Sequence, residues 1–369
     1  MNDEDYGIDE DMTPTRENQL IRSRFYRSVR DPDRGSNGLK TLLVAEVGSV
    51  HDGSFGNACR LVEVAARCGA DAVKFQTHIA SAETLPSAPM PPYFTDEPRY
   101  QYFERTAFSL EQWRALKARC TDNAVEFLAS PFSVEAVELL EALGVSRYKI
   151  PSGEVSNLPY LEVVASTEKP VLLSSGMSSW PELDAAVNLI LRHHDRLTVL
   201  QCTSEYPCPY ELVGLNVMLE MKERYSLPVG LSDHTLTSYA AFVAVTLGAS
   251  VMEKHFTLSR EMYGSDAKHS LEPQEFTDLA RGIRAIETIL TNPVDKNDIT
   301  RFKGMKEMFE KSLVAKVDIP AGTEITRNML GIKKPGTGIP AARLNEVIGR
   351  RTTRDVRANK VLMPEDVQW

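Results

Sequence analysis

The 369-residue sequence has no apolar run long enough to cross a membrane and no apolar segment near its start. A membrane helix needs about 20 consecutive apolar residues, so we expect neither a membrane span nor a signal peptide. A basic excess is also missing, because 42 Lys and Arg face 51 Asp and Glu, which leaves a net charge of -9. Nucleic acid and anionic membranes attract basic proteins, so we expect neither as a partner.

Cysteine is scarce and is not arranged in pairs. The five cysteines include no C-x-x-C motif, and their number is odd. A disulfide framework normally uses an even number of cysteines in an oxidising compartment. The sequence therefore predicts reduced thiols and a cytoplasmic protein.

The first 39 residues lack a sustained apolar period and end in the turn-forming stretch Asp31–Gly38. We interpret residues 1–39 as a polar tail with at most a short helix over Gln19–Val29. A substantial core remains available to the rest of the chain, since 42% of the sequence is hydrophobic.

From residue 40 onward, short apolar runs alternate with amphipathic stretches. Near-continuous apolar runs are typical of parallel strands that are covered on both faces. Eight such β and α units within about 250 residues predict a (β/α)8 TIM barrel over residues 40–291. The alternative, a doubly wound sheet, is less favoured because no G-x-G-x-x-G follows the first run. The eight runs are Leu42–Val47, Ala72–Gln76, Glu126–Ser130, Tyr148–Pro151, Val171–Ser174, Leu197–Cys202, Val229–Ser232 and Val251–Phe256.

Two segments depart from this alternation. The proline-rich stretch Ser81–Phe108 is too long for a simple crossover, and such insertions are either functional loops or surface decoration. After a helix over Gln274–Leu290, we expect a linker over residues 292–311. Short strands and turns then predict a small β-rich domain over residues 312–369.

Polar and ionisable residues collect where the predicted strands end, which is the edge at which TIM barrels build their active sites. His234 and His255 end neighbouring strands, so their imidazoles can meet one divalent metal ion, which carboxylates and water would complete. Glu253 lies two residues before His255 and therefore shares its face of the strand. A single histidine at a strand end is more often structural, but two adjacent ones favour a metal.

Lys74 and Lys149 are predicted to lie inside the mouth of the barrel, where an uncompensated charge is costly. One interpretation is ion pairing with Glu46, Glu154 or Glu253. The other is a clamp for phosphate and carboxylate groups, supported by the hydroxyls of three serines. We favour the clamp because the cations and hydroxyls exceed what ion pairing requires. The serines are Ser130, Ser152 and Ser174.

These residues lie in motifs that resemble the signature set of the bacterial sialic acid (N-acetylneuraminate) synthase family, which includes the legionaminic and pseudaminic acid synthases. The resemblance runs from about Leu42 to the C-terminus, where the last motifs resemble a SAF, or antifreeze-like, domain. The motifs are Ala45–Gly48, His51–Gly53, Lys74–His78, Ser130–Phe132, Tyr148–Glu154, Leu173–Met177, Gln201–Thr203, Ser232–Leu236, Glu253–Phe256, Asp318–Thr323 and Lys334–Ile339.

The resemblance implies an enzyme that condenses phosphoenolpyruvate with an N-acetylmannosamine-type sugar aldehyde and water, releasing phosphate. It implies a divalent metal, first of all Mn²⁺ with Mg²⁺ or Co²⁺ as alternatives, on His234 and His255. It also implies a domain-swapped homodimer in which each SAF domain caps the partner's barrel. Phosphoenolpyruvate is then expected at Lys74, Ser130, Lys149, Ser152 and Ser174.

The remaining candidate residues are expected to transfer protons or to bind the sugar. Glu46 and Glu154 are implied as catalytic residues, and we add His51 from its place after the first strand. The expected sugar-binding residues, from the same motifs and strand ends, are Gln76, Ser204, Tyr206, Ser232, Glu253, Asp266 and Lys334.

Two positions depart from the family's pattern. Val50 stands where an asparagine is common, and Lys334 stands where an arginine is common. Lysine cannot make a planar bidentate contact, so we expect the sugar, or the recognition of its N-acyl group, to differ from N-acetylmannosamine.

Two other classes of function are weaker alternatives. A metal-dependent barrel hydrolase would use the histidines and carboxylates but not two lysines with three hydroxyls. A non-catalytic carbohydrate-binding or ice-binding protein would have no use for so many ionisable strand ends.

Overall fold

The structure is a computed structural model that describes residues 40–89 and 96–369. The predicted tail, with its short helix over Gln19–Val29, lies outside the described residues. By their contacts, the described residues divide into two units, one that ends at Asn292 and one that spans Pro293–Trp369. None of the described helices is long and apolar enough to cross a membrane.

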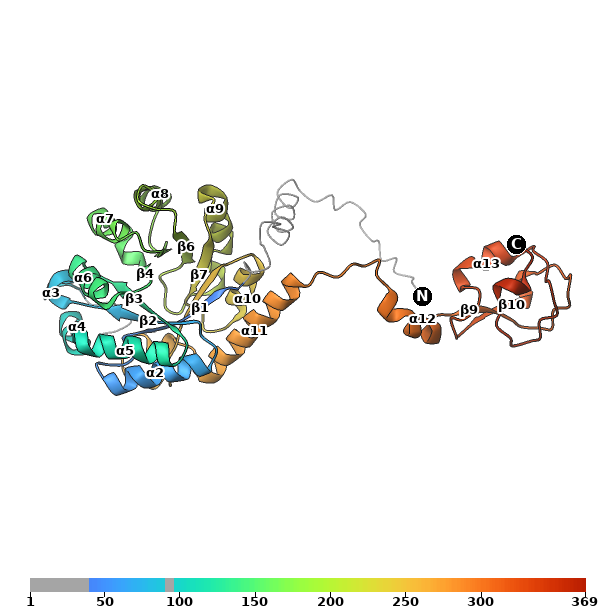
Figure 1. Ribbon diagram of the computed structural model, residues 1–369, viewed down its shortest axis with the longest axis horizontal. Coiled ribbons are helices and arrows are strands. Elements are labelled where there is room, and N and C mark those ends of the chain that lie inside the picture. The colour runs from blue at the N-terminus through green and yellow to red at the C-terminus, as the bar shows by residue number, and fades with distance from the viewer. Residues whose placement is uncertain (1–39, 90–95) are drawn as a thin grey trace, which may run out of the picture. The chain divides into compact units, whose positions relative to one another are not determined.

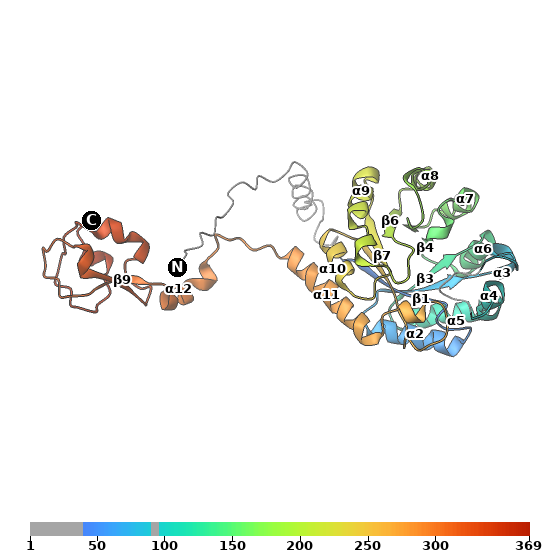
Figure 2. The same ribbon diagram turned by 180° about the vertical axis from the view of Figure 1, so that it is seen from behind.

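The first unit is a closed barrel of eight parallel strands, each hydrogen-bonded to its neighbours in chain order, which confirms the predicted fold. Helices surround the strands in both views (Figures 1 and 2). The strands are β1 (Leu42–Gly48), β2 (Ala72–Thr77), β3 (Glu126–Pro131), β4 (Tyr148–Ile150), β5 (Val171–Ser174), β6 (Leu197–Cys202), β7 (Val229–Asp233) and β8 (Val251–His255).

The helices of this unit carry clear start signals in the sequence. Ser109 and Gln112 form a reciprocal capping box, and the Ser133 hydroxyl accepts a hydrogen bond from the Ala136 backbone N–H. The helices are α2 (Phe55–Arg67), α3 (Ala80–Glu83), α4 (Arg99–Thr106), α5 (Leu110–Asp122), α6 (Val134–Leu143), α7 (Leu158–Ser166), α8 (Trp180–Leu191), α9 (Leu215–Tyr225), α10 (Tyr239–Thr246) and α11 (Pro273–Thr291).

Strand periodicity divides the barrel into two apolar regions. One residue parity points outward and packs against the helices in the main core, as Phe75 on β2 and Leu231 on β7 do. The other parity points inward and forms a separate apolar floor. The floor consists of Leu42, Val44, Ala72, Leu128, Leu172, Leu200 and Val251.

The second unit has its own core, which includes Leu313, Ile325 and Leu362. It contains α12 (Lys303–Phe309), α13 (Leu344–Val347) and an antiparallel pair of strands, β9 (Ser312–Ala315) and β10 (Leu330–Lys333). The Gly336 N–H donates to the carbonyl of Glu307, so the connecting helix packs with this unit. The contacts thus place much of the expected linker with the C-terminal unit, and our domain boundaries stay predictions.

Candidate active site

The candidate site is formed by the layer of inward-facing residues directly above the apolar floor. Every floor residue except Leu42 is followed, two positions later, by a polar residue or a cysteine, and alternate residues of a strand face the same side. Val44 precedes Glu46 on β1, and Ala72 precedes Lys74 on β2. The same step gives Ser130, Ser174, Cys202 and Glu253 on β3, β5, β6 and β8.

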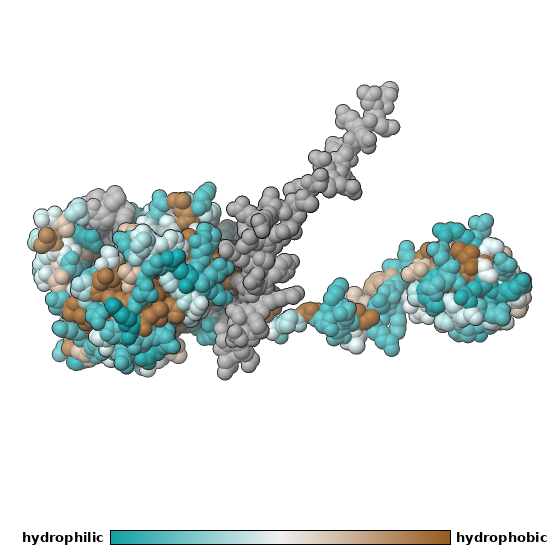
Figure 3. Space-filling view, turned by 90° about the horizontal axis from the view of Figure 1, so that it is seen from above, coloured by the Kyte–Doolittle hydropathy of each residue, from teal (hydrophilic) through white to brown (hydrophobic). Residues whose placement is uncertain are grey.

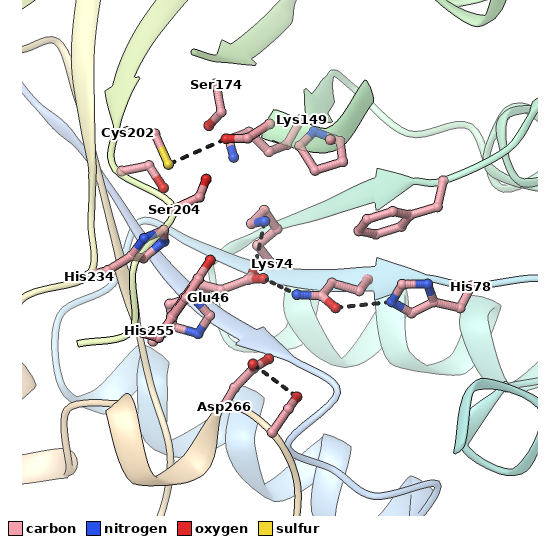
Figure 4. Close-up of a pocket in the computed structure, with 18 of the residues that line it drawn as sticks. Glu46, Lys74, His78, Lys149, Ser174, Cys202, Ser204, His234, His255 and Asp266 are labelled. Carbon is pink, nitrogen blue, oxygen red and sulfur yellow. Dashed lines mark hydrogen bonds and ion pairs between the residues drawn. The ribbon is translucent and has the colours of Figure 1, made fainter. Parts of the chain in front are cut away.

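This polar layer opens into a cavity of about 330 Å³ at the carboxyl ends of the strands, which is where TIM barrels place active sites. Figure 4 shows several of the lining side chains converging on it. Its lining includes Glu46, Lys74, Gln76, Lys149, Ser152, Ser174, Ser204, Tyr206, Ser232, His234, Glu253, His255 and Asp266. The structure therefore brings together thirteen of the seventeen predicted site residues.

Two lysines and two glutamates form a buried charge cluster at the base of the cavity. Lys74 Nζ lies 3.1 Å from Glu46 Oε2 and 3.6 Å from Glu253 Oε1. Lys149 Nζ lies 3.1 Å from the same Glu253 oxygen, which also accepts a hydrogen bond from Ser232 at 2.9 Å. Ion pairing with Glu46 and Glu253 is thus present, whereas Glu154 takes no part in it.

The two glutamates of this cluster have opposite pKa shifts. Burial raises the pKa of Glu46 to about 7, against the lowering effect of Lys74. Burial acts in the same direction on Glu253, but Lys149, Lys74 and the hydrogen bonds from Lys149 and Ser232 bring its pKa down to about 2. Pairs of carboxyls whose pKa values are pushed apart are typical of acid–base sites, and Glu46 is the one poised near neutral pH.

The two lysines also differ. Burial lowers the pKa of Lys149 despite the nearby Glu253. For Lys74, the charges of Glu253 and Glu46 outweigh burial and raise the pKa. The cluster therefore holds two cations against one full carboxylate and one carboxyl that is half ionised near neutral pH. The positive charge of the lysines is therefore not fully compensated by the two glutamates, which favours the binding of an anionic ligand.

His234 and His255 lie next to each other in the wall of the cavity, with ring centroids 5.4 Å apart (Figure 4). The Nδ1 of His234 lies 2.8 Å from the Thr203 carbonyl, which can only accept, so Nδ1 carries the proton and Nε2 keeps its lone pair. Burial lowers the pKa of both histidines to about 3. Both are neutral at physiological pH, as a metal ligand must be.

A divalent cation fits this pair. The tautomer of His234 is fixed by a backbone carbonyl, the outer-shell arrangement typical of metal-binding histidines. Within residues 40–89 and 96–369, no group of three or more His, Cys, Asp or Glu side chains is arranged to hold a metal. Water and substrate oxygens would therefore have to complete the coordination.

Gln76 and Asp266 form another wall of the cavity. Gln76 Nε2 donates to Glu46 Oε1 at 2.9 Å. Gly48 has a φ of +56°, and a Cβ at this position would lie 2.6 Å from Asp266 Oδ2. Glycine is therefore required here both for the backbone conformation and for the close approach of Asp266.

Part of the long insertion between β2 and β3 reaches the cavity. Its residues Glu97, Arg99, Tyr102 and Phe103 contribute to the lining, together with His78 at the end of β2. Sequence reasoning placed His78 at a strand end but left it out of the predicted site, and it could not choose among the residues of the insertion. The geometry therefore supports a functional loop rather than a surface decoration.

Four predicted residues do not line the cavity. His51 is buried in the aromatic core, where its ring stacks on Phe108 at 4.4 Å. Glu154 accepts a hydrogen bond from Asn157 beside the cavity, and Ser130 lies beneath it, bonded to Lys74 at 3.2 Å. Lys334 belongs to the C-terminal unit.

Several buried polar atoms at the cavity have no hydrogen-bond partner among the described residues. Buried polar groups are nearly always satisfied, so unsatisfied ones indicate a missing ligand. They are Ser174 Oγ, Glu253 Oε2 and His255 Nδ1, while Glu46 Oε2 has only the ion pair with Lys74. Their arrangement around two cations suits an anion that also carries hydroxyl or carbonyl groups.

Comparison with known proteins agrees with this geometry. The model of the NeuB family matches residues 61–295, and the SAF domain matches residues 310–368. N,N'-diacetyllegionaminic acid synthase of Campylobacter jejuni is 38% identical over 331 residues, which cover 88% of this chain and 99% of that protein. Human N-acetylneuraminate-9-phosphate synthase is 33% identical, covering 88% of this chain and 92% of that one.

A solved structure has a similar fold and a related sequence. The N-acetylneuraminic acid synthetase of Leptospira borgpetersenii superposes with a TM-score of 0.64 at 28% identity, covering 72% of this chain and 90% of that one. Sialic acid synthases are generally metal-dependent, in keeping with the pair of neutral histidines. The chain belongs to the NeuB family and ends in a SAF domain.

Proposed function

We propose that this protein is a nonulosonic acid synthase that condenses phosphoenolpyruvate with a mannosamine-type sugar aldehyde and water, releasing phosphate. The observation that carries the proposal is the buried cluster of Lys74 and Lys149 beside unsatisfied polar atoms, opposite two neutral histidines. A barrel hydrolase has no use for the two buried cations, and a carbohydrate-binding protein has none for the histidines.

Phosphoenolpyruvate is the anion that we place on the lysines. Its phosphate and carboxylate need cations and hydroxyl donors, which Lys74, Lys149, Ser152 and Ser174 supply from the cavity wall. Preorganised donors in a site that excludes water stabilise developing charge more strongly than water does. Ser130 supports this set indirectly through its hydrogen bond with Lys74.

The reaction forms a carbon–carbon bond and a bond between C2 and a water oxygen, and it breaks the bond between C2 and the bridging oxygen of the phosphate. The C3 carbon of phosphoenolpyruvate attacks the aldehyde carbon of the sugar, whose oxygen takes up a proton. Water adds to the cationic C2 centre and loses a proton, and phosphate leaves with its bridging oxygen. Glu46, with a pKa near 7, is our first candidate to move these protons through Oε2.

Mn²⁺ is the metal that we propose for His234 and His255, with Mg²⁺ and Co²⁺ as alternatives. A divalent cation held there would supply Lewis-acid polarisation of the sugar aldehyde. Gln76, Tyr206, Ser204 and Asp266 are the side chains that we propose to orient the sugar. For Glu154 and His51 a direct catalytic role stays a prediction, and the position of neither side chain supports it.

The sugar is expected to differ from N-acetylmannosamine at the N-acyl group. Val50 is buried in the apolar core, so this position makes apolar contacts and lacks the side-chain amide of the asparagine that is common in the family. Lys334 lies over the ring of Phe309, 5.0 Å from its centroid, as a point charge rather than a planar fork.

We propose that the protein is a domain-swapped homodimer in the cytoplasm, in which Lys334 serves the partner's cavity. Support comes from the family and from the exposed apolar side chains of α12, such as Met305 and Met308, which are 53% and 59% exposed. Figure 3 shows apolar residues among hydrophilic ones on both units. The cytoplasmic location rests on the five free thiols.

Mass spectrometry of the reaction product tests the function. The product should carry the mass of the sugar plus a three-carbon keto acid unit, and it should form only when both substrates are present. Mixing a Lys334→Ala chain with a Glu46→Gln chain tests the shared site, because a swapped dimer restores one complete cavity. Activity of the mixture no higher than that of either variant alone would contradict the swap.

A further inference from the structure

A hydrogen-bonded chain runs from the cavity into the protein behind β2. Glu46 Oε1 accepts from Gln76 Nε2 at 2.9 Å, Gln76 Oε1 lies 3.0 Å from His78 Nε2, and His78 Nδ1 lies 2.7 Å from Glu83 Oε1. Figure 4 shows the contacts from Glu46 as far as His78. The carboxyl that we expect to move protons is thus connected to a second, buried carboxyl on α3.

The directions of these hydrogen bonds depend on one another. Gln76 donates to Glu46 with its amide nitrogen, so its amide oxygen faces His78 and can only accept. Nε2 of His78 must therefore donate. Nδ1 of the same ring lies 2.7 Å from Glu83 Oε1. His78 therefore joins Gln76 to Glu83 through its two ring nitrogens.

Two aromatic rings pack against the His78 side chain. The Phe103 ring stacks on it at 3.7 Å between centroids, and the Phe132 ring lies at 4.2 Å. The side chains of His78 and Glu83 are 4% and 6% exposed, so water competes little for either group. These contacts hold the ring in one orientation.

Other titratable groups surround this chain without breaking it. Asp266 interacts electrostatically with His78 from the wall of the cavity, and His51 does so from the end of β1. Glu154 interacts in the same way with Glu83. On the outer side, the guanidinium of Arg99 lies over the Phe103 ring, 5.2 Å from its centroid.

We propose that His78 and Glu83 are positioning residues for Glu46, acting through Gln76. A carboxamide that is free to rotate could turn its oxygen toward Glu46 and repel the carboxylate. With its oxygen held by His78, Gln76 always presents N–H to Oε1 of Glu46. Oε2, whose neighbour is the Lys74 ammonium at 3.1 Å, is then the oxygen left to exchange a proton in the cavity. The inference rests on the proposed function, because it assigns Glu46 its role.

Substitutions of His78 and Glu83 test this proposal. His78→Phe keeps an aromatic ring between Phe103 and Phe132 but removes both ring nitrogens. We expect kcat to fall by about tenfold to 100-fold, because a misplaced catalytic group costs this much, while the dissociation constant of phosphoenolpyruvate stays unchanged. Glu83→Gln retains an acceptor for His78 and should keep more of kcat than Glu83→Leu does.

The same substitutions in a Glu46→Gln background separate positioning from structural support. If His78 acts through Glu46, His78→Phe causes no further loss of kcat once Glu46 is replaced, since coupled residues are not additive. Full additivity of the two losses, or an unchanged kcat in the single variant, would overturn the proposal. A variant that is merely less stable would not lose kcat in the wild-type background while losing none in the Glu46→Gln background.

Nitrogen NMR of the unmodified protein gives a readout that requires no activity. With ¹⁵N-labelled histidine, His78 should show a proton on Nε2, and its signals are assigned by their loss in His78→Phe. An Nε2 without a proton would refute the proposed chain of hydrogen bonds. A wild-type protein that releases no phosphate but shows His78 protonated on Nε2 would defeat the proposed function and leave the hydrogen-bonded chain standing.

Discussion

Lys254 and Asp233 form a buried ion pair between the residues that precede the two histidines. Lys254 Nζ lies 2.7 Å from Asp233 Oδ2, and each side chain is 1% exposed. The ammonium also donates to Thr235 Oγ1 at 3.1 Å and to the Thr237 carbonyl at 3.0 Å. One residue of β8 thus holds both the end of β7 and the turn that follows it.

We expect Lys254→Met to lower the free energy of unfolding by about 3–5 kcal/mol, because it leaves the Asp233 carboxylate buried and uncompensated. Urea denaturation measures this loss, with Lys296→Met on the exposed linker as the matched control. The double variant Lys254→Met with Asp233→Asn should recover part of it. A single variant as stable as the control would show that the pair contributes nothing.

Lys149→Met should weaken phosphoenolpyruvate binding by about tenfold to 100-fold, since a hydrogen bond to a charged group is worth about 1.5–3 kcal/mol. Titration calorimetry with phosphoenolpyruvate alone measures this change. Lys169→Met, which removes an ion pair with Glu141 at the surface, is the control and should bind normally. Equal affinity in both variants would argue that Lys149 serves only Glu253.

His234→Ala should abolish binding of Mn²⁺ to the isolated protein. The imidazole is neutral and its Nδ1 proton is committed to the Thr203 carbonyl, so Nε2 is the free ligand atom. Electron paramagnetic resonance counts bound and free Mn²⁺ without any turnover. His193→Ala, which removes an exposed histidine paired with Glu162, should leave binding intact, and Mn²⁺ bound equally well by the His234 variant would place the metal elsewhere.

His51 makes the protein less stable in acid. Its folded pKa of about 4 lies below the usual 6.5, because burial and the nearby His78 disfavour the charged form. The unfolded state therefore takes up the proton first, and stability is lost as the pH falls from 6.5 toward 4. At pH 5 the loss amounts to about 2 kcal/mol.

His51→Phe should remove this pH dependence while costing about 1 kcal/mol at every pH, since the Gly53 N–H loses its acceptor. Thermal or urea denaturation of both proteins between neutral pH and pH 5 gives the difference. A pH dependence parallel to that of the wild type would contradict the assignment. Activity of the same variant distinguishes a packing role from the catalytic role that the sequence predicted.

The strands were predictable because a parallel barrel buries both faces of each one, and their apolar runs end within one residue of the observed bounds at nearly every position. The same parity predicted that Glu253 and His255 face inward together. Ion pairs of Lys74 and Lys149 with Glu46, Glu154 or Glu253 could be considered from the sequence, but which lysine meets which glutamate depended on a register that no local pattern records.

Position at a strand end does not by itself give the direction of a side chain. His51 and Glu154 follow strands, yet their backbones turn before the side chains can reach the cavity. Glu83 was missed for the opposite reason, since it lies on a one-turn helix and reaches the site only through His78. Tyr102 and Phe103 lie in an insertion without periodic signal, so only the fold brings them to the cavity.

Phosphate release from phosphoenolpyruvate tests the central claim most directly. Wild-type protein loaded with Mn²⁺ is assayed against a panel of 2-acetamido and 2,4-diacetamido mannose-type sugars, free and as 6-phosphates, with the folded His234→Ala variant as control. The account predicts release that depends on one class of sugar and is lost in the control. Release that proceeds without any sugar, or at the same rate in the control, would contradict it.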